Sequence, residues 1–485
     1  MKRTTSILLL TAMLASLASC GGDAPAADTT AAGASDTTAD AEVTTEETDG
    51  LPDTDMEGFT FHILHADDTQ FAWVNHQLKA DEENGDLVND AVFKRNRYIE
   101  DRFNCKLDIE ETTKVDTKLA SLVMSNEAPD LALMEGRQVI ANIDYIADFN
   151  NLPNLNLEAD YWNPNASSIF DIGGKQLALA GNYILCYISS ASCFMYNKEL
   201  YEELQIKDNL YDLVNEGKWT TEKFYEISRQ GVYDLNGDTK MDKNDRMGSL
   251  SLSLETYYGA LLIGAGFKFV LTDDKDYFSY NIGGNERMIS FMQDMLDRTI
   301  AEPYLYYTTA TQPGSTDAEI KFENGQGLFY QNMLTYVDDY RDMEMDFGIV
   351  PSPKLDENQK QYYSRAALGE IAVLPRSFDM DRAENVGTLL EAMSYHSQKN
   401  LVQTYKEVMV KTKLTRDDDS ADMLEYVFDG ITFDAGMHLM GSINTTIMKN
   451  VYLDRKDVLV STIDSVRSVF DSTVKTIAEK IDEVP

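Results

Sequence analysis

Short apolar runs alternate with stretches of helical period in the first part of the folded chain. Three β-rich or apolar runs predict strands, at 59–65, 106–109 and 130–134. Apolar positions at helical spacing predict two intervening helices, at 87–103, where Asp86 can cap the start, and at 115–123. This order predicts a parallel sheet with helices on both faces. Ligands bind such sheets at the carboxyl ends of the strands, which points to the segment after His65 and to Glu135 and Arg137.

The second part of the chain mixes strands with more helix. The residue patterns predict a strand that runs into a helix within 192–200, and further strands near 329, at 347–350 and at 372–375. They predict other helices from 220 or 221, at 286–299, at 384–395, at 401–410 and at 463–481. The chain has no internal repeat with the period of a solenoid.

The N-terminus has the pattern of an export signal. Lys2 and Arg3 precede an apolar stretch at 7–17, shorter than the roughly 20 residues that span a bilayer. The sequence Leu-Ala-Ser-Cys at 17–20 resembles a bacterial lipobox, which implies a signal peptide at 1–19 and lipidation of Cys20. The alternative is an ordinary signal peptide with a chance cysteine.

The segment 20–56 is rich in Ala, Thr and acidic residues and contains no Lys or Arg. It cannot bury enough apolar area to offset its ordering entropy, so we expect an extended acidic tether. Over the whole chain, 42 Lys and Arg against 82 Asp and Glu give a net charge of −40. This balance excludes a general nucleic-acid binder and argues against attachment to anionic lipid headgroups.

Four segments resemble, in order, the extracellular solute-binding proteins of bacterial ABC importers, in particular the sugar-binding group related to maltose-binding proteins. They are APDLALM at 128–134, YNKEL at 196–200, FENGQG at 322–327 and FGIVPSPK at 347–354. The resemblance implies an α/β, two-lobed periplasmic-binding-protein-like fold (type II) with a multi-strand hinge. We place the first lobe at 57–188 and 327–375, and the second at 189–326 and 376–485.

The same resemblance implies a receptor rather than an enzyme. Such a receptor binds a carbohydrate, here an oligosaccharide, in the cleft and delivers it to the transmembrane subunits of an ABC permease. It acts as a monomer, and lipidated Cys20 is its only membrane contact, on the extracellular face of the cell membrane. Two alternatives are a secreted lipoprotein glycan hydrolase and a surface adhesin outside transport. The chain has no GxSxG, HExxH, P-loop or GxGxxG motif in a convincing context.

A sugar site needs flat aromatic rings and converging hydrogen-bonding groups. The candidates for ligand contact are Trp73, Glu135, Arg137, Trp162, Tyr257 and Asn332. Trp73 follows the first strand and Trp162 precedes the expected first crossing between lobes. Tyr257 is carried over from the resemblance, and Asn332 lies at the expected second crossing. Core packing is the alternative for each aromatic, and a local ion pair is the alternative for Glu135 and Arg137.

An acidic loop has the spacing of a twelve-residue calcium site. Oxygen-bearing side chains fill positions one, three, five, nine and twelve, and a backbone carbonyl is available at seven: Asp234, Asn236, Asp238, Asp242, Asp245 and Lys240. Position six is Thr239 instead of glycine, although Gly237 can share the turn. We expect a structural Ca²⁺ that stabilises this loop, with an acidic surface turn as the alternative.

The cysteines beyond Cys20 are Cys105, Cys186 and Cys193. Export permits a bridge between Cys186 and Cys193. Buried free thiols are the other possibility, and the sequence leaves both open.

Overall fold

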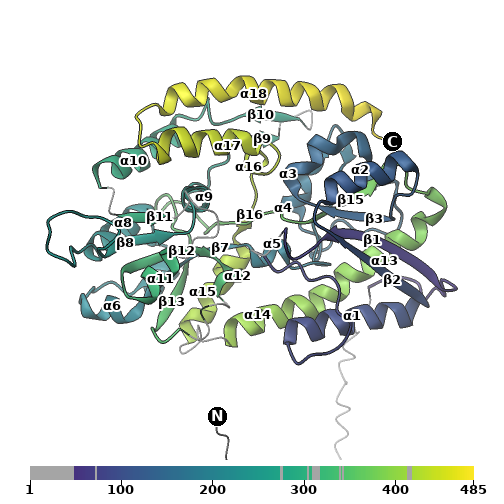
Figure 1. The fold of residues 1–485 in the computed structure, drawn as a ribbon, viewed down its shortest axis with the longest axis horizontal. Helices are drawn as coiled ribbons and strands as arrows, with labels where there is room; N and C mark the ends of the chain where they lie inside the picture. Colours follow the sequence, from purple (N-terminus) through teal and green to yellow (C-terminus); the bar gives the residue numbers. More distant parts are fainter. Residues whose placement is uncertain are drawn as a thin grey trace, which may run out of the picture. The chain divides into compact units, whose positions relative to one another are not determined.

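The computed structural model describes residues 49–485 except 71–73, 273–276, 303–304, 309–316, 338–339, 341–342 and 412–417. Residues 49–485 form one compact unit, within which two five-stranded sheets are the centres of two lobes (Figure 1). The expected signal peptide at 1–19, Cys20, most of the tether and Trp73 lie outside the described residues. Among the described helices, none combines the length and apolarity that a membrane crossing requires.

The first sheet has the strand order β2-β1-β3-β15-β4. Its strands are β1 (Phe59–Ala66), β2 (Cys105–Thr112), β3 (Leu131–Met134), β4 (Ile146–Ala147) and β15 (Ile371–Pro375). β1 runs parallel to β2 and to β3, so the predicted strand–helix–strand–helix–strand unit is confirmed. β15 arrives from much later in the chain and pairs antiparallel with β3 and β4.

The helix between β1 and β2 shows why the first lobe could be predicted locally. α1 (Leu87–Phe103) begins where the Asp86 carboxylate accepts a hydrogen bond from the Asn89 amide, as expected of an N-cap. It ends at Asn104, whose φ of 46° is in the left-handed region that asparagine tolerates. Both signals lie within a few residues of the helix, so neither depends on distant contacts.

The second sheet has the order β11-β8-β12-β7-β13. Its strands are β7 (Ser192–Asn197), β8 (Met247–Ser251), β11 (Tyr306–Thr308), β12 (Gly327–Met333) and β13 (Phe347–Pro351). β7 pairs antiparallel with β12 and with β13. The sequence-based boundaries, which put 327–375 in the first lobe, are therefore corrected. The return crossing comes after β13, because β12 and β13 find their partner β7 in the second sheet.

Helices cover both sheets and join them. They are α1, α2 (Val115–Ser125), α3 (Gly136–Val139), α4 (Pro164–Ser167), α5 (Cys186–Ser189), α6 (Lys198–Glu203), α7 (Leu210–Asn215), α8 (Thr221–Gln230), α9 (Leu254–Gly264), α10 (Glu286–Ala301), α11 (Asp317–Glu323), α12 (Leu334–Val337), α13 (Ala383–His396), α14 (Val402–Lys411), α15 (Asp418–Asp429), α16 (Ala435–His438), α17 (Gly441–Ile447) and α18 (Leu459–Lys480). Three two-stranded pairs complete the fold: β5 (Asp171–Ile172) with β6 (Lys175–Gln176), β9 (Val270–Thr272) with β10 (Phe278–Tyr280), and β14 (Ser364–Arg365) with β16 (Ile431–Thr432).

The last helix lies along both lobes (Figure 1). α18 packs against α10 and β10 beside the second sheet, and against the short helix Ile140–Tyr145 of the first lobe. The Tyr280 hydroxyl donates to the Ile463 carbonyl at 2.5 Å, near the start of α18. At its other end, the Lys480 ammonium donates to the Asp144 carboxylate at 2.5 Å. α18 therefore contacts both lobes.

A buried carboxylate fixes α13 to the first lobe. Glu391, 1% exposed, accepts hydrogen bonds from the Tyr161 hydroxyl at 2.5 Å and the Trp162 indole at 2.9 Å. It also accepts from the Asn156 amide at 3.1 Å. α13 packs against α1 and β1, although the expected boundaries assigned 376–485 to the second lobe. The start of that segment therefore belongs to the first lobe, which is a second correction to the predicted lobe boundaries.

Replacing Glu391 with alanine should lower the free energy of unfolding by about 2–4 kcal/mol. The change leaves buried donors on Tyr161 and Trp162 without their acceptor, and such groups are costly to bury unpaired. Urea unfolding followed by circular dichroism measures the loss. Glu384→Ala, at an exposed position of the same helix, should stay within about 0.5 kcal/mol of the parent. Equal losses in the two variants would contradict the role of Glu391.

Candidate functional site

A cavity of about 280 Å³ lies between segments of the two lobes. The first lobe contributes Glu135 and Arg137, which follow β3 at its carboxyl end. The second contributes the start of α9 and the end of β12 with α12. The segment from β14 towards β15 and the short helix α16 complete the wall. The cavity thus lies at the strand ends where the sequence places a ligand site.

Two arginines and two glutamates give this cavity its charge. The Arg137 guanidinium donates from Nε to Glu135 Oε1 at 2.6 Å. Arg365 Nη2 lies 3.6 Å from Glu255 Oε1, and the Arg365 side chain is 8% exposed. Within the described part of the chain, Arg365 Nε is buried and has no hydrogen-bond partner. The cavity therefore holds balanced charges and one guanidinium donor that is not fully used.

Glycines make room for this arrangement. A Cβ at Gly259 would approach Arg365 Cδ to 2.9 Å, so a larger residue on α9 would displace the guanidinium. A Cβ at Gly136 would approach Leu368 Cβ to 3.0 Å, where the Gly136 amide also donates to the Leu368 carbonyl at 2.9 Å. These contacts fix the segment around Arg365 against both lobes.

His438 on α16 faces the cavity as a neutral group. Burial, together with the positive charges of Arg365 and Arg137, lowers the pKa of His438 to about 3. A neutral imidazole carries one donor and one acceptor, so His438 adds hydrogen-bonding capacity without adding charge.

The second lobe presents polar groups and one aromatic ring. Ser253 caps α9 by accepting the Thr256 amide at 3.1 Å, and both residues line the cavity. Asn332, at the end of β12, donates from its side-chain nitrogen to the Tyr340 hydroxyl at 3.1 Å, which fixes its orientation. Tyr336 on α12 provides an aromatic surface of the kind that sugars use.

No protein-family model matches the sequence, and no curated protein matches it either. Solved structures do match. The cyclic α-maltosyl-1,6-maltose binding protein from Arthrobacter globiformis aligns with a TM-score of 0.58 at 16% identity, over 86% of this chain and 99% of its own. The ABC substrate-binding protein from Listeria monocytogenes in complex with cycloalternan aligns at 0.54 and 12%, over 85% and 99%. The GacH receptor of Streptomyces glaucescens, solved with and without acarbose, aligns at 0.53 and 13%, over 86% and 99%.

The chain has the two-lobed fold of these binding proteins. The expected fold class is therefore confirmed. At these identities the likeness extends to the fold, and the residues in the cleft have to be argued from this chain alone. In the binding-protein fold, the cavity described above lies in the cleft between the lobes.

Three of the six predicted ligand residues meet in this cleft. Glu135, Arg137 and Asn332 line the cavity, and the alternative of a local ion pair between the first two is also realised, inside it. Trp162 and Tyr257 are each 1% exposed and do not line the cavity. Trp162 hydrogen-bonds Glu391, and Tyr257 packs edge-on against Phe194. Trp73 is outside the described residues, so its contact with ligand stays a prediction.

The sequence did not single out several residues that line the cleft. They are Ser253, Glu255, Thr256, Tyr336, Arg365 and His438. On α9, Glu255 and Thr256 line the cavity, whereas the neighbouring Tyr257 is buried in the core. A polar first turn after the Ser253 cap was the signal that could have found Glu255. Arg365 and His438 stand in segments whose position depends on contacts far along the chain.

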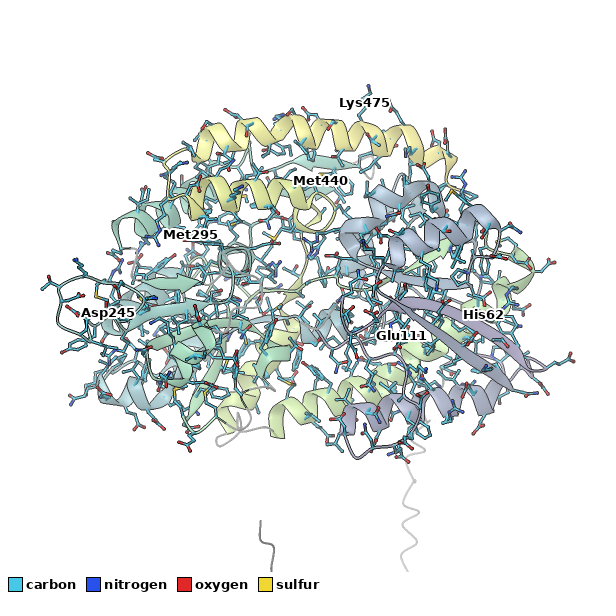
Figure 2. All side chains as sticks on the ribbon, in the orientation of Figure 1. His62, Glu111, Asp245, Met295, Met440 and Lys475 are labelled. Atoms are coloured by element: carbon cyan, nitrogen blue, oxygen red, sulfur yellow. The ribbon has the colours of Figure 1, made fainter. Side chains whose placement is uncertain are left out.

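The acidic loop forms a network around Asp234 and Asp245. Asp234 accepts the amides of Gly237 and Thr239, each at 2.7 Å. Asp245 accepts those of Leu235 at 3.0 Å and Asp242 at 2.8 Å. Thr239 has a φ of 68°, so position six does adopt the left-handed turn that glycine usually fills. Figure 2 places Asp245 at the outer end of the second lobe. Calcium binding here stays a prediction.

Cys105, Cys186 and Cys193 are free in the structure, and the last two are buried. Burial raises the pKa of the Cys193 thiol to about 12, so it stays protonated. These residues therefore act as small apolar side chains.

Replacing His438 with glutamine should make stability less sensitive to acid. In the folded state the pKa of His438 is about 3, below its ordinary value of 6.5, so unfolding takes up a proton between these values. His438 thus contributes stability that is complete above about pH 6.5 and is lost as the pH falls towards 3. The difference in unfolding free energy between parent and variant should shrink from pH 7 to pH 5, as urea unfolding measures. An undiminished difference would show that His438 is not buried as a neutral base.

Proposed function

We propose that this chain is an extracellular substrate-binding protein of an ABC importer that binds a carbohydrate between its lobes. The cleft carries this proposal, because it combines paired charges, neutral hydrogen-bonding groups and an aromatic surface in one cavity. Among the solved structures of the same fold, one is named for binding cyclic α-maltosyl-1,6-maltose, and two are complexes with cycloalternan and with acarbose, which supports a carbohydrate as the solute here.

The balance of charges favours a neutral, hydroxyl-rich ligand. Arg137 with Glu135, and Arg365 with Glu255, place donors next to acceptors, the arrangement that neighbouring sugar hydroxyls require. A phosphate or carboxylate ligand would meet the two glutamates as well as the two arginines. The volume of about 280 Å³ is near the lower end for ligand pockets, so this arrangement of lobes suits a short sugar segment.

The carboxylates in the cavity favour a protein that binds its ligand without catalysis. A glycosidase of the common kind needs one carboxylic acid that holds its proton beside a second carboxylate. Glu135 and Glu255 instead each lie beside a guanidinium group. These ion pairs favour binding over the hydrolase alternative, and the adhesin alternative leaves the cleft without a role.

The attachment of this receptor to the cell belongs to the same proposal. The lipobox-like sequence ending at Cys20 supports a lipid anchor on the extracellular face, followed by the acidic tether. Stable attachment requires two acyl chains, which a diacylated cysteine provides. The transmembrane subunits of the permease are then the partner, and closure of the lobes is the signal they read.

A panel of oligosaccharides should contain at least one that raises the melting temperature, because a ligand that binds only the folded state stabilises it. Calorimetric titration of that sugar should show about tenfold weaker binding for Arg137→Gln and for Glu255→Gln, since each loses hydrogen bonds to ligand. Arg287→Gln, at an exposed arginine paired with Asp356 away from the cavity, should bind as the parent does.

Solution scattering gives a separate readout for the same sugar. The radius of gyration should fall when the ligand is added, because the lobes close. A broad panel that produces neither a thermal shift nor compaction would contradict the proposed function.

We also propose that the loop from Asp234 to Asp245 binds a structural Ca²⁺. The donor set is all oxygen, as calcium requires, and the backbone hydrogen bonds already hold the loop in a turned conformation. Each carboxylate oxygen that accepts one backbone amide keeps a lone pair for a cation.

Calcium should raise the melting temperature by at least about 2 °C, and a calcium chelator should reverse the change. Asp234→Asn keeps an acceptor for one backbone amide but removes the charge, so most of this response should disappear. Asp464→Asn, at an exposed position of α18, is the matched control and should respond as the parent does. Identical melting with calcium and with chelator would exclude the site.

A further inference from the structure

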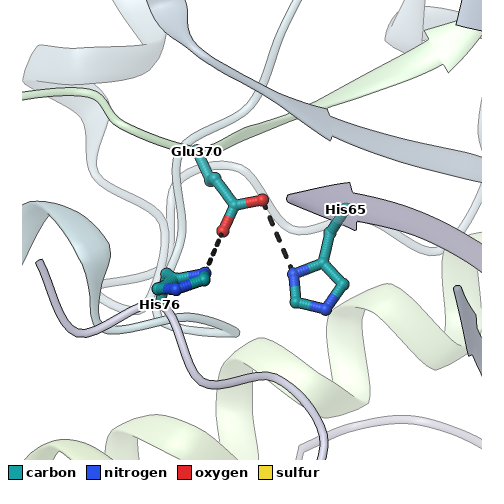
Figure 3. Close-up of side chains that lie close together, drawn as sticks. All are labelled: His65, His76 and Glu370. Carbon is teal, nitrogen blue, oxygen red and sulfur yellow. Dashed lines mark ion pairs between the residues drawn. The ribbon is translucent and has the colours of Figure 1, made fainter. Parts of the chain in front are cut away.

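Two of the five histidines meet one buried glutamate in the first lobe. His65 ends β1, His76 follows in the next segment, and Glu370 directly precedes β15. Their side chains are 2%, 8% and 0% exposed. Within the part of the chain that the structure describes, they are the only group of three potential ligands whose atoms all lie within 4.8 Å. Figure 3 shows both rings turned towards the carboxylate.

The distances in this cluster match the edges of a metal coordination shell. Glu370 Oε2 lies 3.2 Å from His76 Nδ1, and Glu370 Oε1 lies 3.6 Å from His65 Nδ1 (Figure 3). In a tetrahedral zinc site, bonds of 2.0–2.1 Å separate neighbouring ligand atoms by about 3.3 Å. The two distances run to different oxygens of Glu370 and lie on either side of this value, and both imidazoles turn Nδ1 towards the carboxylate.

The outer nitrogen of each imidazole faces a second carboxylate. His65 Nε2 lies 3.7 Å from Glu111 Oε1, and His76 Nε2 lies 3.2 Å from Asp68 Oδ1. Histidines that bind a metal through one nitrogen commonly hydrogen-bond a carboxylate through the other, which orients the ring and increases its basicity. His76 and Asp68 lie at hydrogen-bond distance in this arrangement, while His65 and Glu111 lie at the longer distance of an ion pair.

The hydrogen bonds of the cluster are incomplete. Within the described residues, the ring nitrogens of His65 and Glu370 Oε2 lie at ion-pair distance from neighbouring groups but form no hydrogen bond of good geometry. Buried polar atoms are rarely left unpaired, and an ion is one of the explanations when they are. A buried carboxylate also needs a positive charge nearby, which a divalent cation supplies.

We propose that His65, His76 and Glu370 form a buried binding site for a zinc ion. Two neutral imidazoles and one carboxylate are a donor set that zinc accepts, whereas calcium prefers oxygen ligands alone. A water molecule is the fourth ligand. This site is separate from the acidic loop in both its position and its chemistry.

The zinc ion would join three segments behind the ligand cavity. Glu370 follows Leu368 and Ala367, which line the cavity, by only a few residues. The Glu370 carboxylate also accepts the Ala66 amide at 2.8 Å, which ties it to the end of β1. A metal at this point therefore stiffens the wall of the cleft without touching the solute.

The test is a zinc titration of the chelator-treated protein against a chromophoric competitor, with excess calcium present to occupy oxygen-only sites. One zinc ion should bind per chain and raise the melting temperature. Cobalt should replace it and give the intense visible absorption of a tetrahedral ion with nitrogen ligands. Glu370→Gln should abolish the thermal shift and the cobalt spectrum.

Two further variants keep the test independent of folding. Glu111 and Asp68 are exposed, so Glu111→Gln and Asp68→Asn should fold normally and still weaken zinc binding at least tenfold through the outer carboxylates. His62→Gln changes an exposed histidine of the same strand and should leave binding unchanged. The proposal would be overturned if the protein bound no zinc, or if Glu370→Gln bound zinc with the affinity of the parent. The positive charge next to Glu370 would then come from a proton.

Discussion

A buried charge needs a counter-charge close by, and one short segment of this protein carries two such charges. Arg365 and Glu370 stand near the two ends of the connection from β14 to β15, and both side chains are almost fully buried. Arg365 meets Glu255 from the second lobe, while Glu370 meets two histidines from the first. Because burial without these partners would be costly, the path of the connection is fixed by charges on both lobes.

The cleft depends on the same connection. Its residues 365, 367 and 368 form one wall, and the opposite walls come from the strand ends of the two sheets. The close approach of Gly136 to Leu368 and of Gly259 to Arg365 leaves little freedom for the segment between them. The cavity is thus shaped by backbone contacts first, and its polar side chains are held within that frame.

Local signals explain what the sequence could predict. β1, α1 and β3 were found because their apolar periodicity and the Asp86 cap act over a few residues. Glu135 and Arg137 were found because they directly follow a buried strand. The sequence-based boundaries placed β12 and β13 in the wrong lobe. Their lobe is decided by pairing with β7, which lies more than a hundred residues earlier in the chain. Two of the aromatic candidates lie in the core instead of the cavity, where Trp162 hydrogen-bonds Glu391 and Tyr257 packs against Phe194.

The histidine cluster is a second example of a feature that depends on contacts between distant parts of the chain. With five histidines in 485 residues, the composition gives little indication of a metal site built on histidine. His65, His76 and Glu370 have no characteristic spacing, and the sheet brings them together by placing β15 near β1, separated from it by β3. Motif spacing detects sites that one loop builds, such as the acidic loop at 234–245, and it misses sites that a sheet assembles.

The long C-terminal helix has a mechanical consequence. α18 has 22 residues and is therefore about 33 Å long, with a rigid axis and contacts on each lobe. A helix that contacts each lobe near one of its ends resists changes in the distance between these two contact points. The lobe closure proposed for this receptor would therefore be easiest on the side away from α18, and the helix would set the direction of that movement.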